Sequence, residues 1–236
     1  RAYTTKYFKK LTVGRVQTPT LAMLVERAGQ ISNFQKEKYF NVELDCDGIP
    51  AVKPKIFDPD EAEQLRSRCH GNEAIVTAVK ETEKKVKAPK LYDLTTLQRE
   101  ANRIYGMTAK QTLDTAQSLY EKKLITYPRT DSQYLTEDME QTARNVVSQI
   151  YEKYQLTGPF DQPEQPDVKK VMNNSKVTDH HAIIPTMELA SSHLDELKSW
   201  EEKILFLIAV HTVMAMSKDH IYQETEIEVE CQGEIF

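Results

Sequence analysis

The sequence predicts an α+β fold, in which a mainly helical domain is inserted into a small antiparallel β domain. Strand-like alternation is frequent between residues 39 and 86, and helical spacing of apolar residues dominates from 95 to 217. Strand alternation then returns in the segment "ETEIEVEC" at 224–231. Because the β pattern stands on both sides of the helical one, we expect the two β-rich pieces to share one sheet.

The expected domain boundaries follow these changes of pattern. Residues 1–34 are predicted to be part of a first helical domain, and residues 35–92 the first part of the β-rich domain. Residues 93–218 would form the inserted helical domain, and residues 219–236 the returning strand. The first and last segments also look like the cut ends of a longer protein, so we expect the chain to be a fragment.

The first half of the chain alternates between helix and strand. Helical spacing over 18–31 follows a Thr-Pro pair, and residues 39–46 alternate as a strand. A short helix is expected to begin after Asp58, a good N-cap, and to stop at Gly71. Residues 73–86 then read as one long strand.

Four helices are expected in the inserted domain. The first ends at a glycine, and Thr108 with Gln111 forms a capping box that begins the second. The third covers about 137–154. Ser199 with Glu202 is expected to cap the last helix, which is strongly apolar.

Composition excludes a membrane protein. The longest apolar run, residues 204–216, is shorter than the roughly 18 residues a membrane span needs, and His211 and Thr212 interrupt it. The N-terminus lacks the features of a signal peptide. Cys46, Cys69 and Cys231 lie far apart in the sequence, which favours neither a zinc ribbon nor a disulfide framework. A cytoplasmic protein is therefore expected.

Charge is unevenly distributed. The net charge is −5, but five cations and no acids precede Glu26, so the remaining residues carry −10. We interpret the N-terminal stretch as a basic arm suited to a nucleic acid. Further lysines gather between residues 80 and 90, where a simple solvated face is the favoured explanation.

The segment "LITYPRTDS" at 124–132 places a tyrosine and an arginine two residues apart. If the segment is extended, Tyr127 and Arg129 point to one side and Thr126 to the other, while Pro128 stiffens the backbone. An edge strand that ends in a capped turn accounts for this pattern. The pattern also suits attack on a phosphodiester, with a tyrosine oxygen as nucleophile and an arginine that binds phosphate.

Three segments resemble the type IA DNA topoisomerases, and the bacterial topoisomerase III branch in particular. "LITYPRTDS" resembles their active-site segment, and "TVGRVQTPTLAMLVER" at 12–27 their DNA-binding segment before the β domain. "TDHHAIIPT" at 178–186 resembles their histidine motif. The resemblance implies an enzyme that cleaves and rejoins one DNA strand through a 5′-phosphotyrosine and allows strand passage. It also implies that residues 1–34 belong to a helical DNA-binding domain.

The resemblance assigns roles to particular residues. Tyr127 would be the nucleophile, Arg129 would hold the scissile phosphate, and His180 would stabilise the cleaved state. DNA contacts would come from Arg15, Gln17 and His181. The partner would be single-stranded DNA, and the protein would be associated with the nucleoid.

The resemblance also implies a missing part. Members of this family carry an N-terminal acidic domain with a D-x-D-x-E pattern that binds Mg²⁺, and they need no ATP. The D-x-D of Asp45 and Asp47, with a cysteine between them, does not continue to a glutamate two residues on and is better explained as a hairpin turn. We therefore expect no metal site in this chain, no membrane contact, and an inactive fragment. The alternative is a non-catalytic module or scaffold that binds single-stranded DNA.

Overall fold

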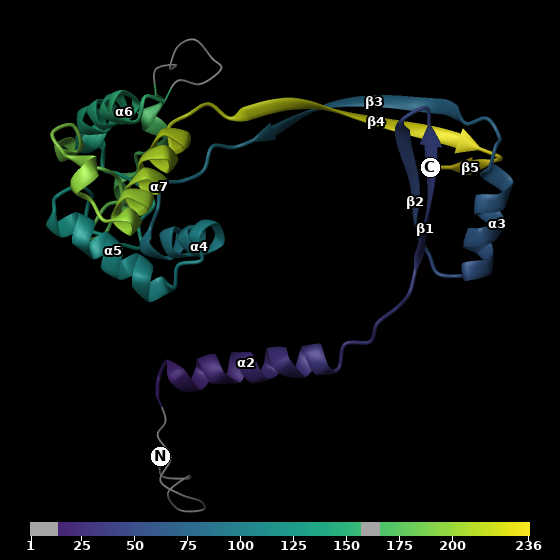
Figure 1. Ribbon diagram of the computed structural model, residues 1–236, viewed down its shortest axis with the longest axis horizontal. Helices are drawn as coiled ribbons and strands as arrows, with labels where there is room; N and C mark the ends of the chain where they lie inside the picture. The colour runs from purple at the N-terminus through teal and green to yellow at the C-terminus, as the bar shows by residue number, and fades with distance from the viewer. Residues whose placement is uncertain (1–13, 157–165) are drawn as a thin grey trace, which may run out of the picture. The chain divides into compact units, whose positions relative to one another are not determined.

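The computed structural model describes residues 14–156 and 166–236 and divides them into two units (Figure 1). One unit comprises the described residues up to Glu81 together with Thr225–Phe236, and the other is Thr82–Glu224. The described residues form helices and two small antiparallel sheets, which confirms the predicted α+β class. Most of the basic arm lies outside the described residues.

The first unit begins with helix α2, Gln17–Ser32, which matches the helix expected at 18–31. None of its residues is buried against another described part of the chain. The apolar side chains that produced the helical pattern are exposed, for example Leu21 and Leu24.

A hairpin follows, formed by strands β1, Phe40–Cys46, and β2, Ile49–Ile56. Its two-residue turn is Asp47 and Gly48, both with positive φ, as type I′ hairpin turns require. The amide of Gly48 also donates a hydrogen bond to a carboxylate oxygen of Asp45 (2.8 Å). The expected hairpin at Asp45–Asp47 is therefore present.

Helix α3, Pro59–Cys69, packs on this hairpin. Asp58 caps it as expected, because its side chain accepts a hydrogen bond from the amide of Asp60 (2.9 Å). The buried face of α3 joins Val42 and Ile56 of the hairpin in a small core. This core gives the first unit its own apolar interior.

The remaining strands form a second sheet in the order β3-β4-β5. They are β3, Ile75–Val86, β4, His220–Cys231, and β5, Glu234–Ile235. Strand β4 pairs with β3, so the C-terminal strand joins the β-rich segment that precedes the helical domain, as the sequence predicted. The two β-rich pieces therefore share a sheet through β3 and β4, as expected, but β1 and β2 do not belong to it, because they pair with each other in a separate sheet.

The structure also brings together two cysteines that are far apart in the sequence. Cys69 ends α3 and Cys231 ends β4, and each is buried in the small core. The Cys69 thiol contacts the carbonyl oxygen of Cys231, with 3.6 Å between sulfur and oxygen, and both thiols are free. Burial and the neighbouring Cys231 raise the pKa of Cys69 to about 11, so the Cys69 thiol stays protonated near neutral pH.

The second unit is a helical bundle (Figure 1). Its long helices are α4, Leu94–Tyr105, α5, Ala109–Glu121, α6, Glu140–Tyr154, and α7, Ser199–Ala215. Short 3₁₀ turns connect them at Glu137–Met139, Val168–Val171, Asn174–Lys176, Met187–Leu189 and Leu194–Glu196. The expected capping box of Thr108 and Gln111 begins α5. No helix in the described part of the chain is long and apolar enough to cross a membrane.

Helix α7 lies at the centre of the larger of the two apolar cores of this unit. Apolar residues surround most of its circumference, so it packs against α4, α5 and α6 at once. Ile204, Leu205 and Ile208 are fully buried there. Leu119 of α5 and Ile150 of α6 complete the same cluster.

The predicted cap of α7 is wrong in its details. The N-cap is Lys198, and its amide donates a hydrogen bond to Glu201 (2.9 Å), whereas Ser199 is already helical and Glu202 is exposed. Glu201 is buried, and it also accepts hydrogen bonds from Ser118 and Lys122 of the α5 end, each 2.6 Å long. These hydrogen bonds make Glu201, and not Glu202, the capping residue, because a buried carboxylate is stable only with several hydrogen-bond donors.

We expect Glu201→Gln to lower the free energy of unfolding at pH 7 by about 3 kcal/mol. Burial acts to raise the pKa of Glu201, but the hydrogen bonds from Lys122, Ser118 and the Lys198 amide outweigh it and lower the pKa to about 2. Since the folded-state pKa lies below the unfolded one, this stabilisation is present above about pH 4.5 and is lost between there and pH 2.

Thermal unfolding of parent and variant at pH 7 and at pH 3 measures this effect. The difference between the two proteins should be large at pH 7 and smaller at pH 3. Glu202→Gln, which changes the neighbouring exposed residue, is the control and should unfold like the parent at both pH values. An equal loss in both variants would contradict the role of Glu201.

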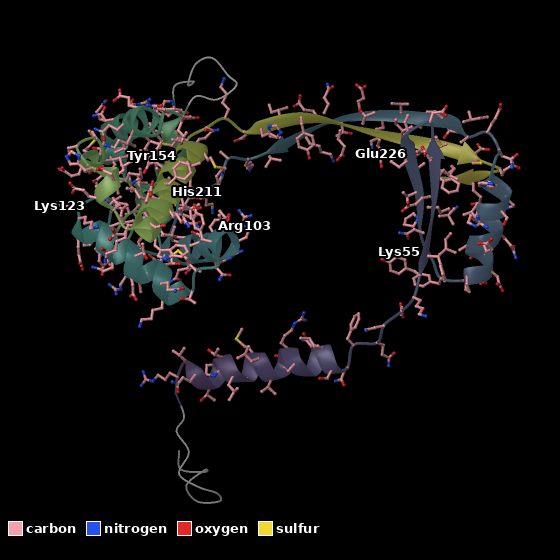
Figure 2. All side chains as sticks on the ribbon, viewed as in Figure 1. Lys55, Arg103, Lys123, Tyr154, His211 and Glu226 are labelled. Atoms are coloured by element: carbon pink, nitrogen blue, oxygen red, sulfur yellow. The ribbon has the colours of Figure 1, made fainter. Side chains whose placement is uncertain are left out.

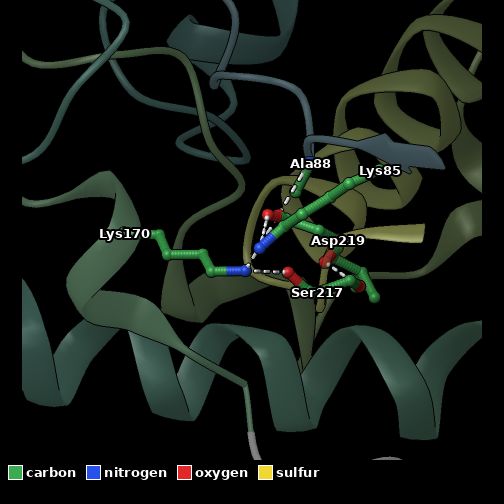
Figure 3. A network of polar contacts seen from close by, with 6 residues as sticks. Lys85, Ala88, Lys170, Ser217 and Asp219 are labelled. Carbon is green, nitrogen blue, oxygen red and sulfur yellow. Dashed lines mark hydrogen bonds and ion pairs between the residues drawn. The ribbon is translucent and has the colours of Figure 1, made fainter. Parts of the chain in front are cut away.

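A polar network stands where β3 and β4 join the helical unit (Figure 3). Asp219, just before the start of β4, accepts hydrogen bonds from the amide of Ala88 (3.1 Å) and from Lys170 (3.2 Å). Lys85 of β3 forms an ion pair with the other carboxylate oxygen (3.3 Å). The Ala88 amide and the lysines lower the pKa of Asp219 to about 2, so it is charged at neutral pH.

Candidate active site

The tyrosine segment is not a strand, contrary to the expectation from its sequence. It follows directly on α5, and only Ile125 forms a bridge, to Pro185. The backbone amide and the hydroxyl of Thr126 form hydrogen bonds with residues 182–184. Strand pairing does not continue beyond them, because Pro128 has no amide N–H to donate. The segment is a loop that hydrogen bonds hold in place, and it contacts the last turn of α5.

Tyr127 is half-buried between two aromatic rings. The ring of Tyr120, from the last turn of α5, meets it edge-on at a centroid distance of 5.3 Å. The ring of His180 lies 4.4 Å away at an angle of 49°. These contacts fix the direction of the phenol without a hydrogen bond from the described residues to its oxygen, which leaves the oxygen available for chemistry.

Arg129 is exposed, and its guanidinium donates a hydrogen bond to the side chain of Gln117 (2.9 Å). Gln117 and Tyr120 are three residues apart on α5, so they share one face of that helix. Tyr127 and Arg129 therefore lie against the same helix face, in agreement with the expected common side. The remaining guanidinium N–H groups of Arg129 are available to bind an anion.

Two threonines hold the tyrosine segment to the histidine segment. The hydroxyl of Thr126 donates to the carbonyl oxygen of Ala182 (2.8 Å) and accepts from the amide of Ile184 (3.0 Å). The hydroxyl of Thr130 donates to the carbonyl oxygen of His180 (3.0 Å). Because one threonine stands on each side of Tyr127, they keep His180 beside the phenol.

The two neighbouring histidines have different surroundings. The side chain of His180 is exposed beside Tyr127. Both ring nitrogens of His181 are shielded from solvent, and neither has a hydrogen-bond partner among the described residues. A DNA contact by His181 would thus require its side chain to turn.

The other expected DNA-binding residues belong to the first unit. Arg15 is exposed just before α2, and Gln17 is the first residue of that helix. The structure groups Tyr127, Arg129 and His180 in the second unit, and it does not group Arg15 and Gln17 with them.

Sequence reasoning missed the supporting residues on α5. Gln117 and Tyr120 precede the tyrosine by ten and seven residues, and their spacing marks one helix face. Because "LITY" follows this helix after a two-residue turn, the end of the helix must lie close to Tyr127. That proximity was the available signal.

Known proteins are similar to this chain over its whole length. The profile of a family described as DNA topoisomerase matches residues 1–236. The chain is 38% identical over 251 residues to DNA topoisomerase 3 of Bacillus licheniformis, and 38% identical over 246 residues to that of Bacillus subtilis. Each match covers 100% of this chain and 34% of the relative, so the chain spans about a third of their length.

A solved structure is similar as well. Full-length topoisomerase I from Thermotoga maritima superposes with a TM-score of 0.72 at 27% identity, over 99% of this chain and 39% of that one. Fold and sequence together define the class as the DNA topoisomerases. The chain belongs to the type IA family of these enzymes, and its curated relatives are bacterial topoisomerases 3.

Proposed function

We propose that this chain is the strand-cleaving part of a type IA DNA topoisomerase. The observation that carries the proposal is the grouping of Tyr127, Arg129 and His180, with the phenol ring 4.4 Å from the imidazole and both basic side chains exposed. The phenol oxygen of Tyr127 attacks the phosphorus of single-stranded DNA. The bond to the 3′ oxygen breaks, that oxygen takes up a proton, and the phenol loses one.

Each residue of the group has a distinct task. Arg129 binds the non-bridging oxygens of the scissile phosphate through the donors that Gln117 leaves free. His180 stabilises the cleaved state from its place beside the ring. Arg15 and Gln17 approach the same strand from the start of α2, and His181 adds a contact after its side chain turns.

The rest of the enzyme would lie outside this chain. We assign Mg²⁺ to an N-terminal acidic domain of the same polypeptide, because Asp45 and Asp47 form a hairpin turn and one carboxylate oxygen is engaged by Gly48. The described residues contain no cluster of three metal-binding side chains. The exchange of one phosphodiester for another conserves bond energy, so no ATP is required. The enzyme would act on the nucleoid in the cytoplasm.

The domain boundaries form part of the proposal. Residues 1–34 would belong to the helical DNA-binding domain, and 35–92 with 219–236 to the β domain. The catalytic helical domain, 93–218, would be inserted between them. Strand passage requires such parts to separate after cleavage and to close again before rejoining.

The chain of 236 residues alone is expected to bind single-stranded DNA weakly and to leave supercoiled DNA unrelaxed. Binding should fall as salt rises, since each neutralised phosphate contributes roughly 0.7 to the log–log slope. Relaxation should fail, because rejoining needs the metal-bearing domain to position the free end.

Incubation with Mg²⁺ and negatively supercoiled plasmid tests the second half, with Tyr127→Phe as control. Relaxation that depends on Tyr127 would show that the acidic domain is dispensable. Covalent attachment without relaxation would support the proposed division. A polypeptide that also contains the acidic domain, yet forms no covalent adduct, would instead favour the alternative of a non-catalytic DNA-binding module.

A further inference from the structure

A second group of cations in the helical unit faces a tyrosine instead of carboxylates. The ammonium of Lys176 lies 4.8 Å from the ring centre of Tyr134 and 3.4 Å from its hydroxyl. The ammonium of Lys90 lies 5.7 Å from the same ring centre. Both lysines are exposed, and neither forms an ion pair in the part of the chain that the structure describes.

This arrangement leaves the two positive charges uncompensated. Many other lysines of the chain lie against carboxylates, for example Lys122 against Glu201 and Lys170 against Asp219. A tyrosine ring holds an ammonium by cation–π attraction without neutralising it. Burial acts to raise the pKa of Tyr134, but the hydrogen bond from Lys176 and the charges of both lysines outweigh it and lower the pKa.

A cavity opens next to Lys90. It holds about 330 Å³, at the lower end of the range for small-ligand pockets. Its polar lining includes Lys90, Arg99 and Glu100, and Glu100 is paired with Arg103 (2.7 Å). Part of its wall is the stacked pair of Tyr92 and His211, whose ring centres are 3.7 Å apart (His211 is labelled in Figure 2).

The aromatic wall of the cavity is rigid and uncharged. His211 forms a hydrogen bond with the carbonyl oxygen of Lys90 (2.7 Å), which fixes the ring. Burial lowers the pKa of His211 below its usual value, so the ring is neutral at pH 7. The cavity lining holds two cations, Lys90 and Arg99, and one carboxylate, Glu100, whose charge is paired with Arg103. A neutral aromatic wall beside these cations suits a group with a flat base and a phosphate.

The group lies a short distance from the candidate active site. Tyr134 follows Tyr127 by seven residues, so the two backbones are at most about 25 Å apart. The intervening loop is tied to the histidine segment at both ends, through Thr130 to His180 (3.0 Å) and through the Ala182 amide to Tyr134 (2.9 Å). A few nucleotides of single strand cover such a distance.

We propose that Lys90, Lys176 and Tyr134 form a second binding site for single-stranded DNA, in which the two lysines bind a backbone phosphate and the adjoining cavity takes a base. The identity of the ligand rests on the function proposed above. The site would hold the strand a few nucleotides away from the phosphate that Tyr127 attacks. It adds affinity and takes no part in bond breaking.

The test measures the binding of a fluorescein-labelled twelve-residue oligothymidylate to the whole chain by fluorescence anisotropy over a range of KCl concentrations. The variant combines Lys90→Ala with Lys176→Ala, and the control combines Lys110→Ala with Lys169→Ala, two exposed lysines of the same unit. The first variant should bind at least about fivefold more weakly, and its log–log salt slope should fall by about 0.7, the contribution of the one phosphate that the two lysines bind. The control should keep most of the parent's affinity and slope.

Two further binding measurements distinguish the contribution of the Tyr134 ring from that of the cavity. Tyr134→Phe keeps the ring under the lysines and should bind like the parent, whereas Tyr134→Ala should bind more weakly. An oligonucleotide of equal length without bases should bind the parent at least about fivefold more weakly than the oligothymidylate, because no base can enter the cavity.

The inference is overturned if the parent does not bind the oligonucleotide, if the lysine variant binds like the parent, or if the control loses as much affinity. Equal binding of the base-free oligonucleotide would overturn the part assigned to the cavity. These outcomes are independent of cleavage by Tyr127, which is measured as a covalent adduct. A lysine variant that binds like the parent, or like its control, therefore overturns this inference alone, whereas a missing adduct counts against the proposed function alone.

Discussion

Tyr127→Phe is expected to reduce covalent attachment to single-stranded DNA by at least about 10⁴-fold in a polypeptide that joins this chain to the acidic domain proposed above. The phenol oxygen is the atom that bonds to phosphorus, and phenylalanine lacks it. The ring contacts to Tyr120 and His180 need only the ring, so they persist in the variant. Unfolding should therefore be nearly unchanged, and DNA binding should be retained.

The measurement is the yield of a protein–oligonucleotide adduct that survives denaturant, with a 3′-labelled strand. Tyr120→Phe is the matched control, because it removes a hydroxyl from the neighbouring ring of the same pair. That control should form the adduct at close to the parent level. An adduct in Tyr127→Phe that disappears in Tyr120→Phe would transfer the role of nucleophile to Tyr120.

Arg129→Lys is expected to reduce cleavage by about 10²-fold or more while the fold is preserved. A guanidinium offers five N–H donors in a plane, so it can bind Gln117 and a phosphate together. Lysine replaces this fork with a single ammonium, which competes for both partners. Because Arg129 is exposed, its substitution leaves the core untouched.

Adduct yield and thermal unfolding should be measured together at matched salt. Arg103→Lys serves as control, since Arg103 is an exposed arginine of α4 that pairs with Glu100 (2.7 Å). It should cleave like the parent. Cleavage by Arg129→Lys at the level of the parent would contradict the assignment of phosphate binding to Arg129, and equal unfolding losses in both variants would indicate a structural effect.

Local signals in the sequence predicted most helices and strands. The capping box at Thr108, the N-cap at Asp58 and the hairpin at Asp47 depend on neighbouring residues only, and all three are present. The cap of α7 was misassigned because Glu201 is fixed by Ser118 and Lys122, more than 75 residues away. Local spacing contains no information about such donors.

At the candidate site, too, the sequence did not predict contacts between residues that are distant along the chain. The resemblance of short motifs pointed to Tyr127, Arg129 and His180, and the structure places these residues together. The extended conformation expected for the tyrosine segment was wrong, because bonds to residues 182–184 replace strand pairing there. Likewise, the contact of Cys69 with Cys231 depends on tertiary packing that joins the two ends of one unit.

The ion pair between Lys84 and Glu224 (3.1 Å) brings the two ends of the helical unit together. These residues stand near the first and last positions of the unit Thr82–Glu224, so the chain enters and leaves that unit at the same place. A segment whose two ends meet can be accommodated in a host as one insertion, without stretching the strands that flank it. It can also be excised or exchanged as a cassette, or given new termini by joining its ends with a short linker. The helical unit thus has the geometry of a transferable module, which the chain enters along β3 and leaves along β4.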